Sequence, residues 1–386
     1  MMKILRIEYQ NIAVFKNGFA IDLTTKDRVF QNSPVSKVYK TINTNNITCM
    51  IGINASGKTT ALKLIDMAIK IVAGNVGLDG IDIGSKLLVD GSKMIVDFFV
   101  NDSFYRLQSM IGEKSSGNKT ELYFKDEIIF IKPKKEVVNR KTLFSYDESH
   151  IKYRRSDWEE EILSLIKDQD SISAVIKKDT SIANRNYLNE SNSNIYTVPG
   201  KAQMDSINLF DDSIQSILRK DRVVDITFKD SYNHISDRNG LDVLSSGTIR
   251  GANLLFNIRH TLCFGGIIVV DQLESHMNKR LIQLILELFA DGDINRKGAM
   301  LIFSTHYAEI LETITRKDSI YVMVRKENYA SVAERYSDVV KRNDVKKSEV
   351  ILSNYINGTV PKYEYVEKLR EFLCEDVSLP EADNNE

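Results

Sequence analysis

The chain has 386 residues, enough for one large domain or two to three ordinary ones. Its hydrophobic fraction of 42% and charged fraction of 27% exclude a wholly disordered chain. With 52 basic and 53 acidic side chains, the net charge is −1, so a globally basic nucleic-acid coat is excluded. No apolar run approaches the roughly 20 residues needed to span a bilayer. Three widely separated cysteines predict reduced thiols and a cytoplasmic location, with no membrane partner.

The first third of the chain predicts strands and one helix. Residues 2–24 are expected to form two short strands, and residues 25–45 to be irregular. A short buried strand is expected at 47–51, followed by a helix with apolar spacing at 59–72. From 86 to 132 the sequence alternates between apolar and polar residues, with Gly-, Asn- and Ser-rich breaks. This pattern predicts an antiparallel meander.

The remainder predicts an alternation of helices and buried strands. Two or three helices are expected over 157–220, including one from Trp158 to Lys167. The elements expected after them are strands at 223–228, 266–270 and 299–303 and helices at about 248–262 and 278–289. Continuous apolar strands that alternate with helices indicate a largely parallel sheet covered on both faces, and therefore an α/β fold.

Residues 52–59 read Gly-Ile-Asn-Ala-Ser-Gly-Lys-Thr and match the phosphate-binding loop GxxxxGK[ST]. Gly52 and Gly57 let the backbone turn tightly, so that successive N–H groups point at phosphate oxygens. The start of the following helix adds partial positive charge. Lys58 is expected to reach the β- and γ-phosphates, and the Thr59 hydroxyl to bind Mg²⁺. The motif predicts binding of a nucleoside triphosphate.

A carboxylate stands at the end of the strand at 266–270. Asp271 occupies the edge of the sheet at which ligands bind in parallel sheets. A helix-capping aspartate would also fit this position. Because the chain also carries a phosphate-binding loop, we expect Asp271 to hold Mg²⁺ through water beside Thr59.

Two more motifs follow in a fixed order. The segment Leu244-Ser-Ser-Gly-Thr248 opens a predicted helix before Asp271, and His306 ends the next buried strand. With these four motifs the chain resembles the soluble ABC-type ATPases of the RecF, structural-maintenance and OLD-like group. It is also similar to the AAA-family ATPases of bacterial abortive-infection, antiphage systems. The resemblance implies an ABC-type P-loop core with an antiparallel β meander and a helical lobe insertion.

The resemblance also implies a site shared by two copies of the chain. Two subunits would face head to tail and trap two ATP molecules, with LSSGT of one copy capping ATP on the P-loop of the other. Taken alone, LSSGT would be read as a serine-capped helix start. Ser245 would bond the γ-phosphate, Gly247 would offer its backbone N–H, and His306 would contact the γ-phosphate. A Q-loop is expected between 86 and 108, without an assigned residue.

The expected site residues fall into three groups. The ATP-binding group comprises Gly52, Asn54, Ala55, Ser56, Gly57, Lys58, Thr59 and Thr60 of one copy, with Ser245, Ser246 and Gly247 of the other. The catalytic group comprises Lys58, Gln272 and His306. The Mg²⁺ ligands are Thr59 and Asp271.

One position departs from the pattern of the family. Its magnesium-binding Asp is normally followed by a Glu that polarises the attacking water, whereas this chain has Gln272. A neutral amide can orient water but cannot accept a proton. Glu274 fills the second acidic position and is no obvious replacement. Either a Glu was changed to Gln to trap the ATP-bound dimer, or the chain is a natural ATPase that hydrolyses ATP slowly. In both cases we expect hydrolysis to be impaired.

The expected organisation has five parts. Residues 1–150 form the ATPase lobe with P-loop and meander, 151–240 the helical insertion lobe, and 241–330 the rest of the ATPase core. Residues 331–374 form a C-terminal extension and 375–386 a disordered acidic tail. The extension carries no acidic metal-binding cluster of a nuclease, so a nuclease or toxin effector should be a separate chain.

Four functions are open to a chain with these motifs, and two of them are disfavoured. The first is an ATP-dependent regulatory switch that works as a homodimer or higher oligomer on a separate effector in antiphage defence. The second is a RecF-like or chromosome-type DNA-repair ATPase, whose DNA contact would use the basic residues of 132–155. These residues could equally form a solvated loop. A transporter subunit is disfavoured by the long meander, and a GTPase by the lack of an NKxD segment.

Overall fold

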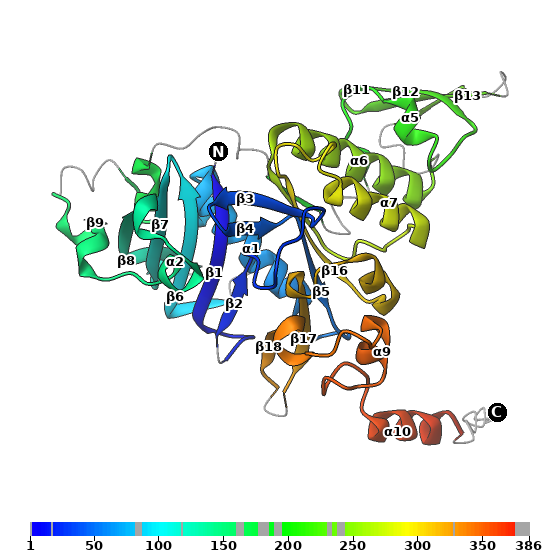
Figure 1. Ribbon diagram of the computed structural model, residues 1–386. Helices are drawn as coiled ribbons and strands as arrows, with labels where there is room; N and C mark the ends of the chain where they lie inside the picture. Colours follow the sequence, from blue (N-terminus) through cyan, green and yellow to red (C-terminus); the bar gives the residue numbers. More distant parts are fainter. Residues whose placement is uncertain are drawn as a thin grey trace, which may run out of the picture.

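The structure is a computed structural model that describes residues 2–16, 18–81, 87–116, 119–159, 166–176, 185–188, 195–229, 234–237, 244–326 and 329–374. Its described strands form two six-stranded sheets, one four-stranded sheet and one two-stranded sheet. The chain therefore has the mixed α/β architecture of a parallel-sheet P-loop domain with added antiparallel sheets (Figure 1).

The first sheet is antiparallel throughout and has the order β2-β1-β6-β7-β8-β9. Its strands are β1 (Lys3–Ile12), β2 (Phe19–Asp22), β6 (Leu88–Val100), β7 (Ser103–Ser116), β8 (Lys119–Pro133) and β9 (Ile151–Arg154). The meander predicted over 86–132 is confirmed in β6, β7 and β8. These long strands alternate buried and exposed side chains because one face packs on the core.

The second sheet carries the predicted parallel strands and has the order β10-β15-β16-β5-β17-β18. Its strands are β5 (Ile47–Ile51), β10 (Arg185–Leu188), β15 (Ile267–Val270), β16 (Met300–Thr305), β17 (Ile320–Arg325) and β18 (Ser331–Arg335). Only β18 runs antiparallel to its neighbour. The carboxyl ends of β5, β15, β16 and β17 therefore meet at one edge.

Both faces of the parallel sheet are buried, which explains its uninterrupted apolar runs. In β15, Ile267 and Val269 join the core around α1 (Lys58–Gly74), whereas Ile268 and Val270 join the core around α6 (Ser246–Phe264) and α7 (Lys279–Ala290). Helix α1 lies between the meander and the parallel sheet (Figure 1). It is apolar on most sides because it is enclosed by both sheets.

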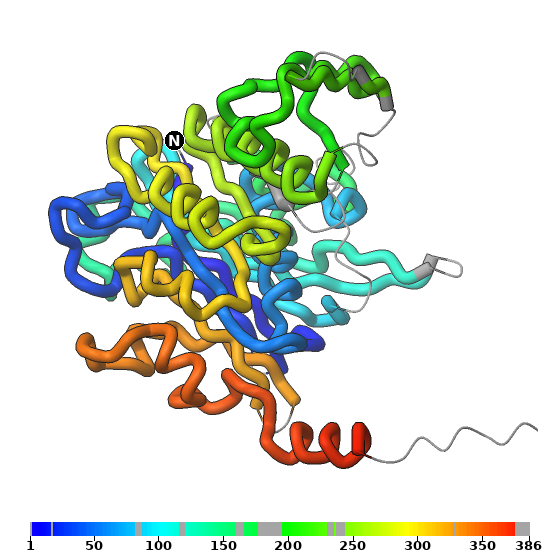
Figure 2. The backbone as a smooth tube through the Cα atoms, turned by 90° about the vertical axis from the view of Figure 1, so that its right-hand side faces the viewer, coloured from blue at the N-terminus to red at the C-terminus, as the bar shows by residue number. Residues whose placement is uncertain are grey.

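The smaller elements lie at the ends of the molecule. The four-stranded sheet consists of β11 (Gly200–Lys201), β12 (Ile214–Lys220), β13 (Val223–Phe228) and β14 (His234–Asp237), with the short α5 (Met204–Ile207) beside it. The C-terminal part contains α8 (Tyr336–Val339), α9 (Lys347–Leu352) and α10 (Tyr363–Cys374). Figure 2 shows this sheet and α10 at opposite ends. Elsewhere lie β3 (Val35–Tyr39), β4 (Ile42–Asn45) and α2 (Arg140–Leu143).

The helical lobe expected over 151–240 is wrong for the described residues, which form mainly strands. Ile214, Ile217 and Leu218 have the spacing of a helical turn, but they belong to β12. A bulge between Ile214 and Ser216 shifts the register, so that Ile214 and Ile217 face the same core. Most of the helix expected from Trp158 to Lys167, and the whole acidic tail 375–386, lie outside the described residues.

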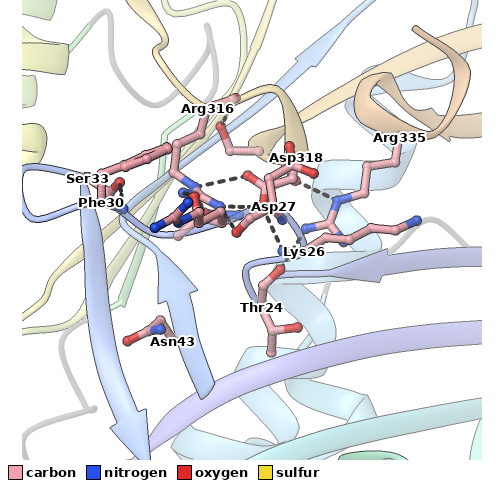
Figure 3. A network of polar contacts seen from close by, with 12 residues as sticks. Thr24, Lys26, Asp27, Phe30, Ser33, Asn43, Arg316, Asp318 and Arg335 are labelled. Carbon is pink, nitrogen blue, oxygen red and sulfur yellow. Dashed lines mark hydrogen bonds and ion pairs between the residues drawn. The ribbon is translucent and has the colours of Figure 1, made fainter. Parts of the chain in front are cut away.

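The irregular segment expected at 25–45 is also partly wrong, because β3 and β4 form a hairpin there. Its strands are short and mostly polar, which conceals the alternation on which the prediction depends. Behind this hairpin, the segment 24–28 is fixed by a buried ion pair between Arg316 and Asp318 (Figure 3). The network joins the N-terminal region to the start of β17.

Candidate nucleotide-binding site

The segment 52–57 connects β5 to α1, and close packing explains its two glycines. A side chain at Gly52 would place its Cβ 2.3 Å from the carbonyl oxygen of Met323 and 2.7 Å from Ser56 Oγ. Gly57 has a φ of 97°, which L side chains rarely adopt. The loop is therefore pressed against β17 and turns sharply into the helix, as a phosphate cradle requires.

Lys58 lies over this loop with 6% of its surface exposed. Its Nζ donates to the carbonyl oxygens of Gly52 and Ile53, each at 2.8 Å. Burial lowers the pKa of Lys58 to about 8, against the charges of Asp271 and Glu274, which raise it. A buried ammonium held only by carbonyls is ready to exchange them for an anionic ligand.

Thr59 and Asp271, predicted to share a metal ion, lie in contact. The Thr59 hydroxyl donates to Asp271 Oδ2 at 2.7 Å. The other carboxylate oxygen accepts a bond from Ser304 at 2.5 Å. Ser304 was missed by the sequence analysis, although it stands in the same strand end as His306. One hydroxyl and one carboxylate at this edge fit the oxygen ligands that Mg²⁺ prefers.

Gln272 lies at the mouth of the site in a left-handed conformation, with φ 52°. Its backbone N–H donates to Ser304 Oγ at 2.8 Å, and its side-chain oxygen accepts from Ser275 at 3.2 Å. A buried arginine, Arg250, donates to the carbonyl oxygens of Asp271 and Gln272, each at 2.8 Å. Arg250 was also missed, because nothing about its position in the predicted helix at 248–262 marks it as a residue of the site. Together these bonds fix the turn after β15.

Glu274 lies behind the cavity, not in it. Its Oε1 accepts the backbone N–H of His306 at 2.7 Å, and within the described residues its buried Oε2 has no hydrogen-bond partner. Burial and the charge of Lys58 lower the pKa of His306. The charges of Glu274 and Asp271 raise this pKa, as does a hydrogen bond with the backbone of Gly52. Glu274 therefore positions the turn that carries His306.

A cavity of about 570 Å³ opens beside these residues, a size that suits a nucleotide. It is lined by eight residues of the predicted site: Asn54, Ala55, Gly57, Lys58, Thr59, Thr60, Gln272 and His306. Gly52, Ser56 and Asp271 are buried in its walls. The lining also contains Ala13, Val14, Lys16, Arg325, Tyr329 and Ser331, which the sequence analysis did not identify.

The signature residues lie elsewhere in the chain. Ser245 caps α6 by accepting the backbone N–H of Thr248 at 3.1 Å, and Ser246 contacts His276 Nδ1 at 3.1 Å. Gly247 packs so closely that a Cβ would lie 2.7 Å from the carbonyl oxygen of His276. Among the described residues that line the cavity, none comes from 244–248 or from the Q-loop region 87–108. Ser245 and Ser246 are exposed.

Part of the basic stretch considered for DNA contact is engaged within the protein. Arg155 is buried and pairs with Glu127 at 3.0 Å, and Arg140 pairs with Asp22. Lys132 donates to the carbonyl oxygens of Thr142 and Ser145. These three cations are held within the protein, whereas Lys135, Lys141 and Lys152 are exposed, so DNA contact stays a prediction.

Comparisons with known proteins bear on this site. A family model described as "AAA domain, putative AbiEii toxin, Type IV TA system" matches residues 47–312, well over half of the chain. The match includes the loop 52–59, the signature segment, Asp271 and His306. No curated protein matches the chain. Within the described residues, no helix is long and apolar enough to cross a membrane.

Proposed function

Because the chain belongs to the family of AAA domains described as putative AbiEii toxins of type IV TA systems, we propose that it is an ATP-dependent switch. This family consists of P-loop ATPases related to the ABC and RecF group. Two copies pair head to tail on Mg²⁺-ATP, hydrolyse it slowly, and thereby control a partner protein in bacterial antiphage defence. ATP drives the pairing only to the extent that the paired state binds it better.

The observation that carries the proposal is the separation of the two halves of the site. The cavity contains the P-loop, Gln272 and His306 but no described residue of the signature segment. Ser245 and Ser246 instead face outward at the start of α6, a 19-residue helix whose N-terminus favours anions. A second copy can supply this helix start to the open side of the cavity.

The metal and phosphate roles follow from the contacts. Thr59 and Asp271 would hold Mg²⁺, which neutralises phosphate charge when it is bound. Lys58 would leave its two carbonyl partners for the β- and γ-phosphates. Gln272 orients water without accepting its proton, so turnover is slow and the closed state is long-lived.

The partner follows from the family description, which names a toxin of a type IV TA system. We infer that the chain acts together with a second protein, an antitoxin or a separate effector such as a nuclease or toxin. The partner protein then responds to the ATP-dependent pairing of this chain.

The test is the mass of the protein in solution, measured by light scattering with Mg²⁺ and either ATP or ADP. We expect the single-chain mass of 44.0 kDa with ADP and a doubled mass with ATP. Ser245→Arg should abolish the doubling, whereas Ser156→Arg, at an exposed serine outside the cavity lining, should preserve it. ATP-dependent pairing of the Ser245→Arg variant would refute the signature contact.

A further inference from the structure

The β17–β18 hairpin packs directly on the phosphate-binding loop. The Met323 carbonyl in β17 occupies the space beside Gly52, and Ser331 in β18 lies where a Cβ on Gly57 would approach Ser331 Oγ to 2.9 Å. Ser331 also donates its backbone N–H to the carbonyl oxygen of Val14 at 3.0 Å. The hairpin thus packs against both ends of the loop, and these contacts fix its position relative to the loop.

Arg325 ends β17 at this edge and faces two adjoining hollows. It lines the cavity of about 570 Å³ and a neighbouring groove of about 1350 Å³, and both also contain Asn54 and His306. The groove includes residues 51–54 at the start of the loop, but not Gly57, Thr59 or Thr60. Arg325 therefore lies where the cavity adjoins the groove, together with Asn54 and His306.

The guanidinium of Arg325 is oriented by Tyr329. Its Nε donates to the carbonyl oxygen of Tyr329 at 3.2 Å, and it lies 5.5 Å from the centre of the Tyr329 ring. In the part of the chain that the structure describes, Arg325 forms no ion pair, whereas the adjacent Lys326 pairs with Glu334. An oriented cation with unused donors suits a phosphate, which arginine binds with two parallel hydrogen bonds.

We propose that Arg325 is a further ligand of the terminal phosphate of ATP, contributed by the same copy as the P-loop. The inference rests on the proposed function, because it requires ATP in the cavity with its γ-phosphate beside His306. Arg325 would then distinguish ATP from ADP within one chain, before a second copy arrives. The γ-phosphate would then be contacted at the end of β17 as well as by the start of α6 from the second copy.

The experiment compares equilibrium binding of Mg²⁺-ATP and Mg²⁺-ADP by calorimetry, at protein concentrations where ADP leaves the chain single. The variants are Arg325→Ala, Arg325→Lys, the matched neighbour Lys326→Ala, and Lys58→Ala, each checked for an unchanged unfolding midpoint. We expect Arg325→Ala to weaken ATP about tenfold or more, as loss of a charge-assisted hydrogen bond does, with ADP nearly unaffected. Arg325→Lys should recover part of the loss, and Lys326→Ala should bind as the parent.

The outcomes separate the two claims. If the parent chain does not bind ATP, or Lys58→Ala binds it equally well, the proposed function fails. If the parent binds and Lys58→Ala does not, yet Arg325→Ala retains full affinity, only the assignment of Arg325 is wrong. Equal weakening of ATP and ADP would also overturn the terminal-phosphate contact.

Discussion

In the proposed site, Gln272 takes the position expected for the catalytic base. Its amide is oriented by Ser275, and its backbone is fixed by Ser304 and Arg250, so the geometry around it is complete. What the side chain lacks is a proton acceptor. In the proposed mechanism, the absence of this base, and not the architecture of the site, limits turnover.

Replacing Gln272 with Glu should restore this acceptor. We expect Gln272→Glu to hydrolyse ATP at least about tenfold faster, because a general base contributes roughly 10²–10⁴-fold. Steady-state phosphate release measures the effect, and Gln272→Ala serves as a control that should show no gain. Equal rates for the parent and Gln272→Glu would contradict the assigned position of the base.

Lys58 predicts a pH dependence of ATP binding. Its pKa in the nucleotide-free chain is about 8, lowered by burial, and phosphate charge raises it on binding. Binding must therefore take up a proton above about pH 8, and ATP affinity should fall as pH rises from there toward the ordinary lysine value of 10.5. Below about pH 8, Lys58 is already protonated and contributes no such fall.

Calorimetry across this range measures the effect, with Lys58→Gln as the control. The residual binding of that variant should not share the fall above pH 8, since it has no ammonium to titrate. An affinity of the parent chain that stays constant through the same range would show that Lys58 does not contact the phosphates.

Among the elements, β17 connects the site to the rest of the fold. At its start, Asp318 is fully buried and accepts bonds from Arg316 and from the backbone N–H groups of Lys26 and Asp27, while Arg335 holds its carbonyl oxygen (Figure 3). At its end stands Arg325. A buried acid with this many partners fixes the strand along its length.

Removing this acid should be costly. Asp318→Ala leaves the Arg316 cation buried and unpaired, which should lower the free energy of unfolding by about 3–5 kcal/mol. Urea unfolding measures the loss. Asp344→Ala, which breaks the exposed pair with Arg342, should leave the midpoint unchanged. Similar midpoints for both variants would mean that the network does not fix β17.

Sequence reasoning was most accurate where a motif and a buried strand coincide. The strand ends at Ile51 and Val270 follow from continuous apolar runs, and the loop 52–59 and Asp271 follow directly after them. The run 299–303 predicts β16 except for its last two residues. Arg325 could have been found by the same argument, because it directly follows the apolar run 320–324. The contacts of Ser304 and Arg250 could not, because they depend on which loops meet in three dimensions.

The four-stranded sheet shows why a lobe is harder to predict than a core. Its β12 contains a bulge, so two buried isoleucines stand three residues apart as in a helix. No local signal separates the two arrangements. Tertiary pairing with β13 decides between them.

At the scale of the whole molecule, this sheet and the signature share one core. Leu244, Ile249 and Ala252 pack with residues of β12 and β13, and the ring of Phe210 lies against Gly251. The lobe therefore holds the first turns of α6, where Ser245 stands. The proposed division at residues 150, 240, 330 and 374 assigns the start of α6 to the ATPase core. The residues that pack against this helix start belong to the lobe 151–240.

A site that is formed by two copies can be tested by mixing two variants, because each variant damages a different half of the site. Lys58→Ala removes the phosphate contact of its own copy, and Ser245→Arg removes the cap that it offers to another. In a head-to-tail pair, one mixed dimer then retains one intact site, formed by the loop of the Ser245→Arg copy and the signature of the Lys58→Ala copy. Each variant alone retains none.

The most direct test is therefore the mass distribution of the two variants, alone and mixed, with ATP and Mg²⁺. We expect each variant alone to stay at 44.0 kDa, and the mixture to form dimers that contain one copy of each, identified by different tags. A mixture that remains at the mass of a single chain, or either variant pairing on its own, would contradict the account.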